Sequence, residues 1–145
     1  MYYYNYEEFT EDVEILRNDA KIFEPDIILA VARGGVTLGH FLAEKFKIRA
    51  LYTLNSIHYD ETKKLDTIEV FNIPNLPSHR RVLVVDDIVD SGESLEEIMK
   101  ILKHKFPKTI FKTAVLFYKK DAIFTPDFKI KEPHDWIEFF WTKPK

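Results

Sequence analysis

The sequence of 145 residues predicts an α/β protein with a mainly parallel central sheet flanked by helices. Two continuous apolar runs, at residues 27–32 and 82–85, are typical of strands buried on both faces. Segments with apolar residues at helical spacing alternate with the strands, which indicates βαβ units joined by right-handed crossovers. The length fits one domain, so residues 1–145 are expected to form a single unit.

In chain order, the first element is a helix expected over residues 6–24, which Pro25 ends. Its apolar positions recur at helical spacing: Phe9, Val13, Leu16, Ala20 and Phe23. Residues 27–32 are the first buried strand, and Gly34 with Gly35 turns the chain into a second helix. The apolar face of that helix is expected to hold Leu38, Phe41, Leu42 and Phe46.

A second strand is expected at residues 49–54, and a charged stretch with weak periodicity follows at 58–66. A short strand at 68–71 precedes the buried strand at 82–85. The next helix has an apolar face made of Leu95, Ile98, Met99 and Leu102. Two further strands are expected at 113–117 and 128–130, before an aromatic tail that is expected to cap one edge of the sheet together with the N-terminal residues.

The composition limits the classes of function. An apolar share of 46% with 31% charged residues is ordinary for a soluble globular protein, and a net charge of −3 gives no electrostatic footprint for nucleic acid. The absence of cysteine excludes disulfides and thiolate chemistry. The N-terminal residues do not resemble a signal peptide, and no apolar run approaches the length of a membrane span. A cytoplasmic location is therefore expected.

Residues 82–95 carry the densest chemistry in the chain. The buried strand runs into two adjacent acids, Asp86 and Asp87, which repel each other and serve neither a core nor a helix cap. Acids at the carboxyl end of a parallel strand lie where open α/β sheets bind ligands. The following turn offers backbone N–H groups and two hydroxyls to an anion at a helix N-terminus. A structural alternative for the turn is a capping box over residues 94–97.

The segment 82–95 resembles the phosphoribosyl-pyrophosphate (PRPP) motif of the type I phosphoribosyltransferases, and the resemblance extends from residue 27 to residue 141. It implies the type I phosphoribosyltransferase fold, with a small hood over the ligand edge formed by residues 118–145 and the N-terminus. By resemblance, Asp86 and Asp87 bind the ribose hydroxyls and hold Mg²⁺, in part through water. The implied 5-phosphate loop consists of Asp90, Ser91, Gly92, Glu93 and Ser94. The resemblance also makes Asp90 the candidate general base.

Two further segments gain a role from the resemblance. Arg33, Gly34 and Gly35 alone indicate only a strand-to-helix turn beside a charged residue, but the family grips pyrophosphate at this place. An arginine offers a fork of donors to phosphate oxygens, and glycine lets the backbone approach closely. Residues 56–64 alone indicate an exposed loop, whereas the family has a lid there, in which Tyr59 is expected to act on PRPP. His58 stands where many members carry serine.

The base pocket is expected at Lys119, Trp136 and Ile137. Alone, a lysine after a strand indicates a surface turn, and a tryptophan indicates core packing. In the 6-oxopurine branch of the family, a lysine donates to the purine O6 and an aromatic–aliphatic pair stacks on the base. The Trp-Ile-Glu sequence at 136–138 is similar to that of bacterial xanthine-guanine phosphoribosyltransferases.

The resemblance thus implies a Mg²⁺-dependent purine-salvage enzyme. It would convert PRPP and a 6-oxopurine (guanine, xanthine or hypoxanthine) into a nucleoside monophosphate and pyrophosphate, as a homo-oligomer (dimer or tetramer). No nucleic acid or membrane partner is expected. Two alternatives remain open: a regulatory module of the same fold that binds PRPP or nucleotides without catalysis, and a phosphoribosyltransferase for adenine, uracil or orotate. The ranking of the three 6-oxopurines is not readable from the sequence.

Overall fold

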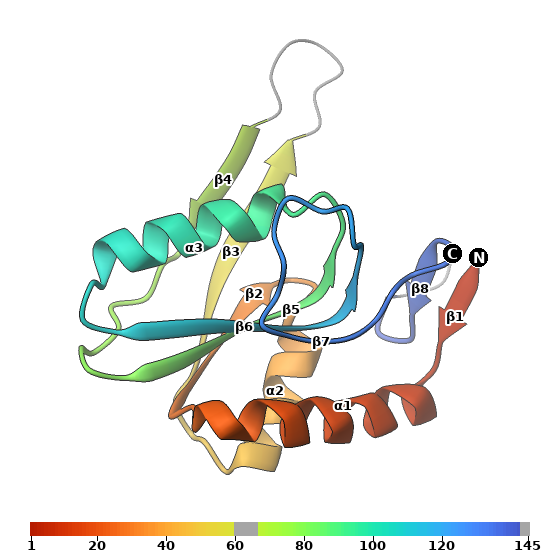
Figure 1. Cartoon of the computed structure of the whole chain (residues 1–145), viewed down its shortest axis with the longest axis horizontal. Coiled ribbons are helices and arrows are strands. Elements are labelled where there is room, and N and C mark those ends of the chain that lie inside the picture. The colour runs from red at the N-terminus through yellow and green to blue at the C-terminus, as the bar shows by residue number, and fades with distance from the viewer. Residues whose placement is uncertain (60–66, 143–145) are drawn as a thin grey trace.

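The structure, a computed structural model, describes residues 1–59 and 67–142 (Figure 1). In chain order its elements are β1 (Tyr2–Tyr4), α1 (Tyr6–Ala20), the 3₁₀ turn η1 (Lys21–Phe23), β2 (Ile27–Ala32), α2 (Val36–Phe46), β3 (Leu51–Tyr59), β4 (Thr67–Phe71), β5 (Arg81–Val89), α3 (Glu93–Lys105), β6 (Ile110–Tyr118), β7 (Phe128–Lys131) and β8 (Ile137–Phe139). They build a six-stranded sheet of order β4-β3-β2-β5-β6-β7 and a two-stranded sheet of β1 and β8.

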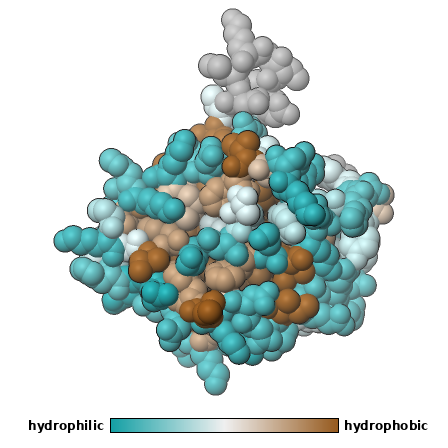
Figure 2. Space-filling model, viewed as in Figure 1, coloured by the Kyte–Doolittle hydropathy of each residue, from teal (hydrophilic) through white to brown (hydrophobic). Residues whose placement is uncertain are grey.

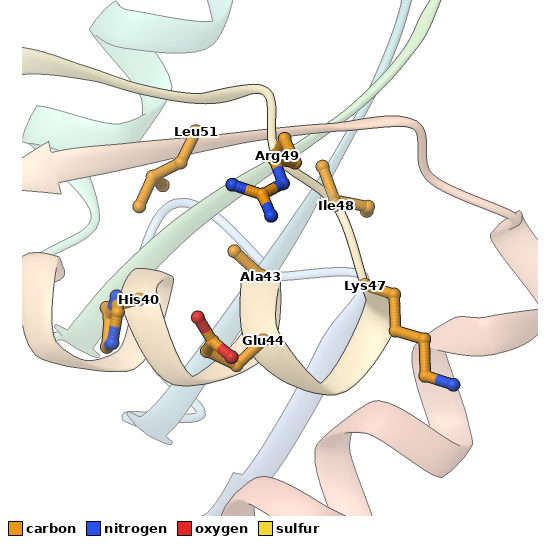
Figure 3. Close-up of a pocket in the computed structure, with 7 residues that line it drawn as sticks. All are labelled: His40, Ala43, Glu44, Lys47, Ile48, Arg49 and Leu51. Atoms are coloured by element: carbon orange, nitrogen blue, oxygen red, sulfur yellow. The ribbon is translucent and has the colours of Figure 1, made fainter.

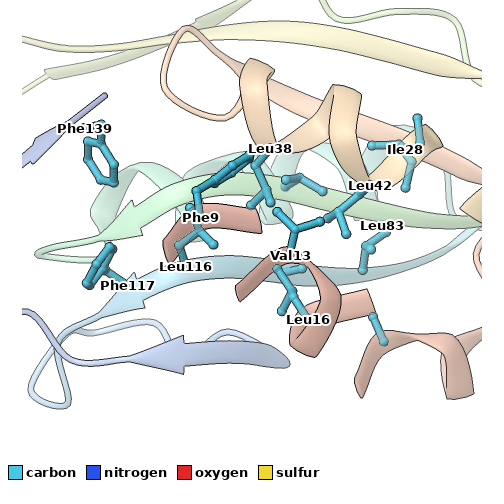
Figure 4. Close-up of a cluster of buried hydrophobic side chains, with 14 of the residues drawn as sticks. Phe9, Val13, Leu16, Ile28, Leu38, Leu42, Leu83, Leu116, Phe117 and Phe139 are labelled. Carbon is cyan, nitrogen blue, oxygen red and sulfur yellow. The ribbon is translucent and has the colours of Figure 1, made fainter. Parts of the chain in front are cut away.

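The large sheet is mainly parallel, as the sequence predicts. Strands β3, β2, β5, β6 and β7 pair in parallel, and only β4 runs antiparallel, against β3. Successive residues of the central strands face opposite sides, so Leu83 and Val85 belong to the core under α1 and α2, while Val82 and Val84 belong to the core under α3. Figure 4 shows side chains of the first core between the helices and the sheet. The continuous apolar runs therefore exist because the strands are covered on both faces.

The first helix ends earlier than expected. Asn5 caps its start by accepting a hydrogen bond from the Glu8 N–H at 2.8 Å, and α1 ends at Ala20 before η1. All five apolar positions predicted for this helix are buried. The last of them, Phe23, reaches the core from the 3₁₀ turn, and Glu24 then leaves the helical conformation with a φ of 53° ahead of Pro25.

Two strands extend well beyond their predicted C-terminal ends. Strand β3 continues to Tyr59, so the start of the predicted charged stretch is a strand paired with β4. Strand β5 continues to Val89, so Asp86 and Asp87 lie within the strand rather than after it. The ladder with β2 stops at Val85, whereas the ladder with β6 runs on to Val89. The acids consequently lie where β5 no longer pairs with β2, beside the loop that leaves β2.

The structural alternative for this turn, a capping box over residues 94–97, does not occur. Helix α3 begins at Glu93, and its N-cap is Gly92, in the left-handed conformation with a φ of 90°. Ser94 therefore lies inside the first turn. Ser91 instead takes part of the capping role, because its hydroxyl accepts a hydrogen bond from the Glu93 N–H at 3.2 Å. The predicted apolar face of α3 is confirmed as buried.

The two ends of the described chain meet in the small sheet (Figure 1). The Tyr2 N–H donates to the Trp136 carbonyl at 2.8 Å, and the Phe140 N–H donates to the Tyr4 carbonyl at 3.0 Å. The Tyr4 ring is fully buried and packs edge-on against aromatic rings from four elements and loops: Phe9, Phe117, Phe139 and Trp141. Aromatic packing thus joins the small sheet, hereafter the β1–β8 sheet, to the body. The assignment of residues 1–145 to one domain stays a prediction.

The surface is of mixed character. On the face seen in Figure 1, hydrophilic residues surround smaller apolar patches (Figure 2). Among the described helices, none is both long and apolar enough to cross a membrane.

Candidate active site

The loop after β2 lies directly against the acids of β5. A Cβ added to Gly34 would come within 2.5 Å of Asp87 Oδ2, and one added to Gly35 would collide with the Val85 carbonyl oxygen. The backbone of β5 therefore requires glycine at position 35, and a side chain at position 34 would displace the Asp87 carboxylate. The peptide bond between Ala32 and Arg33 is cis, and the Arg33 side chain is exposed. The structure thus brings the predicted pyrophosphate loop and the predicted ribose-binding acids together.

Asp86 and Asp87 form a tightly coupled pair of half-buried acids. The Asp87 N–H donates to Asp86 Oδ1 at 2.8 Å, and the Ile88 N–H donates to Asp87 Oδ1 at 2.7 Å. Burial, followed by the charge of Asp87, raises the pKa of Asp86 well above its ordinary value, and burial also raises the pKa of Asp87. Ionising both acids is therefore costly in the free protein, and a bound cation would offset that cost.

These two acids fit Mg²⁺ in the way the family implies. Magnesium binds through one or two carboxylates and keeps water and substrate phosphates as its other ligands. Within residues 1–59 and 67–142, no group of three or more potential metal-ligating side chains occurs, so the protein does not offer a complete cage there. Asp86 and Asp87 would supply the protein's share of the site.

The turn between β5 and α3 borders a cavity of about 310 Å³, hereafter the phosphate cavity. It is lined by His58, Asp86, Ile88, Val89, Asp90, Ser91, Gly92, Ser94 and Leu95. The loop after β6 packs against this turn. The Ile123 N–H donates to the Ser91 carbonyl at 2.9 Å, and the two segments are so close that a Cβ on Gly92 would lie 2.7 Å from the Phe124 nitrogen. The first turn of α3 presents its N–H groups here, which suits an anion.

Glu93 has a different environment from the other predicted phosphate-loop residues. It does not line the phosphate cavity; its carboxylate accepts the Ser91 hydroxyl at 3.3 Å and lies 3.7 Å from the His58 imidazole. The sequence reading missed His58, which it treated only as a departure from serine.

A second cavity of about 820 Å³, hereafter the base cavity, adjoins the β1–β8 sheet. Its lining residues are Met1, Ile88, Asp90, Lys119, Pro133, Trp136, Ile137, Glu138, Phe139 and Thr142. All three residues predicted for the base pocket are among them. Trp136 is 75% exposed, so it is a rim residue and not a core residue. Ile88, which the sequence reading took only as part of the motif, lines both cavities.

Lys119 and Asp90 form an ion pair across the base cavity. Lys119 Nζ lies 2.5 Å from Asp90 Oδ1, and this hydrogen bond together with the charge of Asp90 raises the pKa of Lys119. The Lys119 N–H donates to the Val89 carbonyl at 3.0 Å, which fixes the loop after β6 beside the loop after β5. Lys120 pairs instead with Glu132 at 3.4 Å, so Lys119 is the lysine that faces this cavity.

A buried polar network, missed by the sequence reading, supports the β1–β8 sheet. The Tyr4 hydroxyl donates to Asp12 Oδ2 at 2.7 Å, and Lys131 Nζ lies 2.9 Å from the same oxygen and 2.8 Å from Glu8 Oε2. Asp12 is only 5% exposed. Burial and the bond to Asp12 raise the pKa of Tyr4; burial alone would lower the pKa of Lys131, but its bonds to Glu8 and Asp12 raise it. An acid on the apolar face of a predicted helix is the signal that could have revealed the network.

Tyr59 is not brought to either cavity. It ends β3, is 41% exposed, and donates from its hydroxyl to Glu69 Oε1 on β4 at 3.2 Å. Residues 60–64 of the predicted lid lie outside the described residues. A lid role for Tyr59 stays a prediction.

A further cavity of about 420 Å³ lies on α2 and the connection to β3 (Figure 3). It is lined by His40, Ala43, Glu44, Lys47, Ile48, Arg49 and Leu51. None of the predicted site residues borders it, so it is separate from the phosphate and base cavities.

Comparison with known proteins agrees with this geometry. The model of the phosphoribosyl transferase domain family matches residues 13–144, and the chain belongs to that family. A curated xanthine-guanine phosphoribosyltransferase of Idiomarina loihiensis is 31% identical over 117 residues, which are 79% of this chain and 69% of the relative. The type I phosphoribosyltransferase fold predicted from the sequence is thereby confirmed.

Two solved structures illustrate the likeness. The xanthine-guanine-hypoxanthine phosphoribosyltransferase of Helicobacter pylori is 39% identical, with a TM-score of 0.90 over 97% of this chain and 92% of that chain. A purine phosphoribosyltransferase of Pyrococcus horikoshii is 25% identical, with a TM-score of 0.85 over 99% of this chain and 94% of that chain.

Proposed function

We propose that this protein is a 6-oxopurine phosphoribosyltransferase, which forms a nucleoside monophosphate and pyrophosphate from PRPP and guanine, xanthine or hypoxanthine. One observation carries the proposal: Asp90 and Ile88 line both the phosphate cavity and the base cavity. A ribose 5-phosphate in the first cavity and a purine in the second would therefore meet beside Asp90. The relatives named above are transferases of the same class.

The reaction breaks the bond between ribose C1 and the pyrophosphate oxygen and forms a bond from C1 to a purine nitrogen. Positive charge develops on C1 and negative charge on the leaving pyrophosphate. Arg33 is exposed at the loop beside the acids, where its guanidinium would stabilise the leaving group. The purine nitrogen loses its proton to Asp90, and such a positioned base contributes roughly 10²–10⁴-fold in rate.

Lys119 supports the choice of base. Its ammonium group can only donate, so it pairs with the carbonyl oxygen at position 6 of a 6-oxopurine and not with the amino group of adenine. Trp136, exposed at the rim of the base cavity, offers a ring face on which a purine can stack. Ile137 supplies the aliphatic wall beside it.

Asp86 and Asp87 would hold Mg²⁺ together with the substrate. When bound, the metal neutralises charge on the pyrophosphate and the two acids. The protein's own contribution is to keep the two carboxylates in fixed positions through the N–H groups of Asp87 and Ile88. A homo-oligomeric state and a cytoplasmic location remain predictions.

No observation favours a regulatory module or a different base. A direct test is to incubate the protein with PRPP, Mg²⁺ and each of hypoxanthine, guanine, xanthine, adenine and uracil, and to measure nucleotide and pyrophosphate. At least one 6-oxopurine should react with a kcat/KM roughly 100-fold or more above those of adenine and uracil. Product from no base would overturn the assignment as an enzyme, and product from adenine or uracil alone would overturn the assignment of the base.

A further inference from the structure

The phosphate cavity is bordered by a histidine that reaches it from a different element. His58, near the end of β3, lines the cavity opposite the turn that carries Ser91 and Ser94. Its imidazole Nε2 lies 3.7 Å from Glu93 Oε1 on the first turn of α3, and its side chain is 30% exposed. The imidazole is therefore held at the cavity and remains open to solvent on one side.

The charge of the cavity makes this histidine important. Among the described lining residues, His58 is the one basic side chain, while Asp86 and Asp90 are acids. Lys119 pairs with Asp90, but a phosphate of charge near −2 would still meet Asp86, and Glu93 lies beside the same turn. Backbone N–H groups at the start of α3 supply only partial positive charge. An imidazolium would supply the missing full charge.

We propose that His58, as an imidazolium, binds the 5-phosphate of PRPP and of the product nucleotide. The inference rests on the proposed function and deepens it. In the free protein Glu93 holds the imidazole at 3.7 Å, and the incoming phosphate replaces Glu93 as its partner. A charge-assisted hydrogen bond of this kind contributes roughly tenfold or more in affinity.

The test compares wild type with His58→Gln by titration calorimetry, using inosine 5′-monophosphate and, separately, inorganic pyrophosphate with Mg²⁺. The Kd of His58→Gln for the nucleotide should be about 10 times that of wild type. Pyrophosphate has no ribose 5-phosphate, so wild type and His58→Gln should bind it with equal affinity.

Two matched variants sharpen the test. His104→Gln changes a histidine in the last turn of α3 and should leave nucleotide binding unchanged. Glu93→Gln removes the competing carboxylate and should tighten nucleotide binding by roughly two- to fivefold. Equal Kd values for wild type and His58→Gln, or an equal loss for pyrophosphate, would overturn the role of His58 while leaving the proposed function intact. A wild-type protein that binds neither the nucleotide nor pyrophosphate would overturn both.

Discussion

The phosphate half and the base half of the site are built in different ways. The phosphate half takes most of its lining from residues 86–95, a continuous segment at the end of β5 and the start of α3. The base half combines Lys119 after β6 with Trp136 and Ile137 at β8, and β8 in turn is held by β1 from the other end of the chain. One half depends on local sequence, and the other depends on pairing between distant segments.

The halves also differ in their charge balance. In the phosphate half, burial and the charge of Asp87 raise the pKa of Asp86, and burial raises the pKa of Asp87. In the base half the acids have cationic partners: Asp90 pairs with Lys119, and Asp12 pairs with Lys131. The phosphate half is therefore incomplete until a cation and substrate arrive, whereas the base half is already organised in the free protein.

Asp90 belongs to both halves, and its removal should have the largest effect. We expect Asp90→Asn to lower kcat by roughly 10²–10⁴-fold, because the purine proton loses its acceptor, while the Kd for PRPP changes little. Steady-state kinetics and PRPP titration measure the two effects. Asp121→Asn, an exposed acid in the loop after β6, is the matched control. A kcat within twofold of wild type would remove Asp90 from the mechanism.

Disrupting the polar network of Tyr4, Asp12 and Lys131 beneath the β1–β8 sheet should have the second-largest effect. Lys131→Met leaves Asp12 buried without its cation, which we expect to lower the free energy of unfolding by about 2–4 kcal/mol. Because the network supports the sheet that holds Ile137 and starts next to Trp136, the KM for the purine should rise more than the KM for PRPP. Urea unfolding and steady-state kinetics measure these quantities.

Lys129→Met provides the control, since Lys129 is on the same strand and contacts only the Tyr118 ring among the interactions found, at 5.4 Å. Equal increases in both KM values for Lys131→Met would mean that the two halves are not separable.

Lys119 tests base selection more directly. We expect Lys119→Met to lower kcat/KM for hypoxanthine by roughly 10–100-fold, because the carbonyl oxygen of the base loses a charged donor. The KM for PRPP should change by less than about threefold. Lys120→Met is the control, because Lys120 pairs with Glu132 away from the base cavity. Unchanged use of hypoxanthine would assign base recognition to another group.

The sequence predicted most of the phosphate half because its chemistry is local. The order Asp86, Asp87, Asp90, Ser91 and Gly92 carries the pattern by itself, and the buried runs predicted the central strands. The length of β5 was underestimated because its continuation depends on hydrogen bonds to β6, which no local pattern records. The capping box failed for a similar reason, since the left-handed Gly92 sets the start of α3 one residue before Ser94.

The base half was harder to predict. Lys119, Trp136 and Ile137 were predicted from the family resemblance, and their local patterns alone favoured a surface turn and a core residue. The supporting network could not be found from local pattern, because Lys131 and Glu8 are separated by 123 positions. His58 was missed because its role depends on how the end of β3 lies against α3.

The difference in charge balance between the two halves predicts the smallest effect, but it can be tested most directly. A raised pKa means that the folded protein holds the proton of Asp86 more tightly than the unfolded chain does. This contribution to stability is full below about pH 4 and is lost as the pH rises through the pKa of the folded state. At neutral pH the ionised acid therefore costs stability, and Asp86→Asn should remove that cost.

The decisive measurement is the free energy of unfolding of Asp86→Asn and Asp12→Asn between pH 4 and 8, without Mg²⁺ or PRPP. The account predicts that Asp86→Asn is more stable than wild type by about 1 kcal/mol at pH 7.5, with the gain disappearing near pH 4. Asp12→Asn should be less stable at pH 7.5, because Lys131 loses its buried partner. A loss of stability in Asp86→Asn at pH 7.5 would contradict the account, since the acids would then serve the fold and not the ligand.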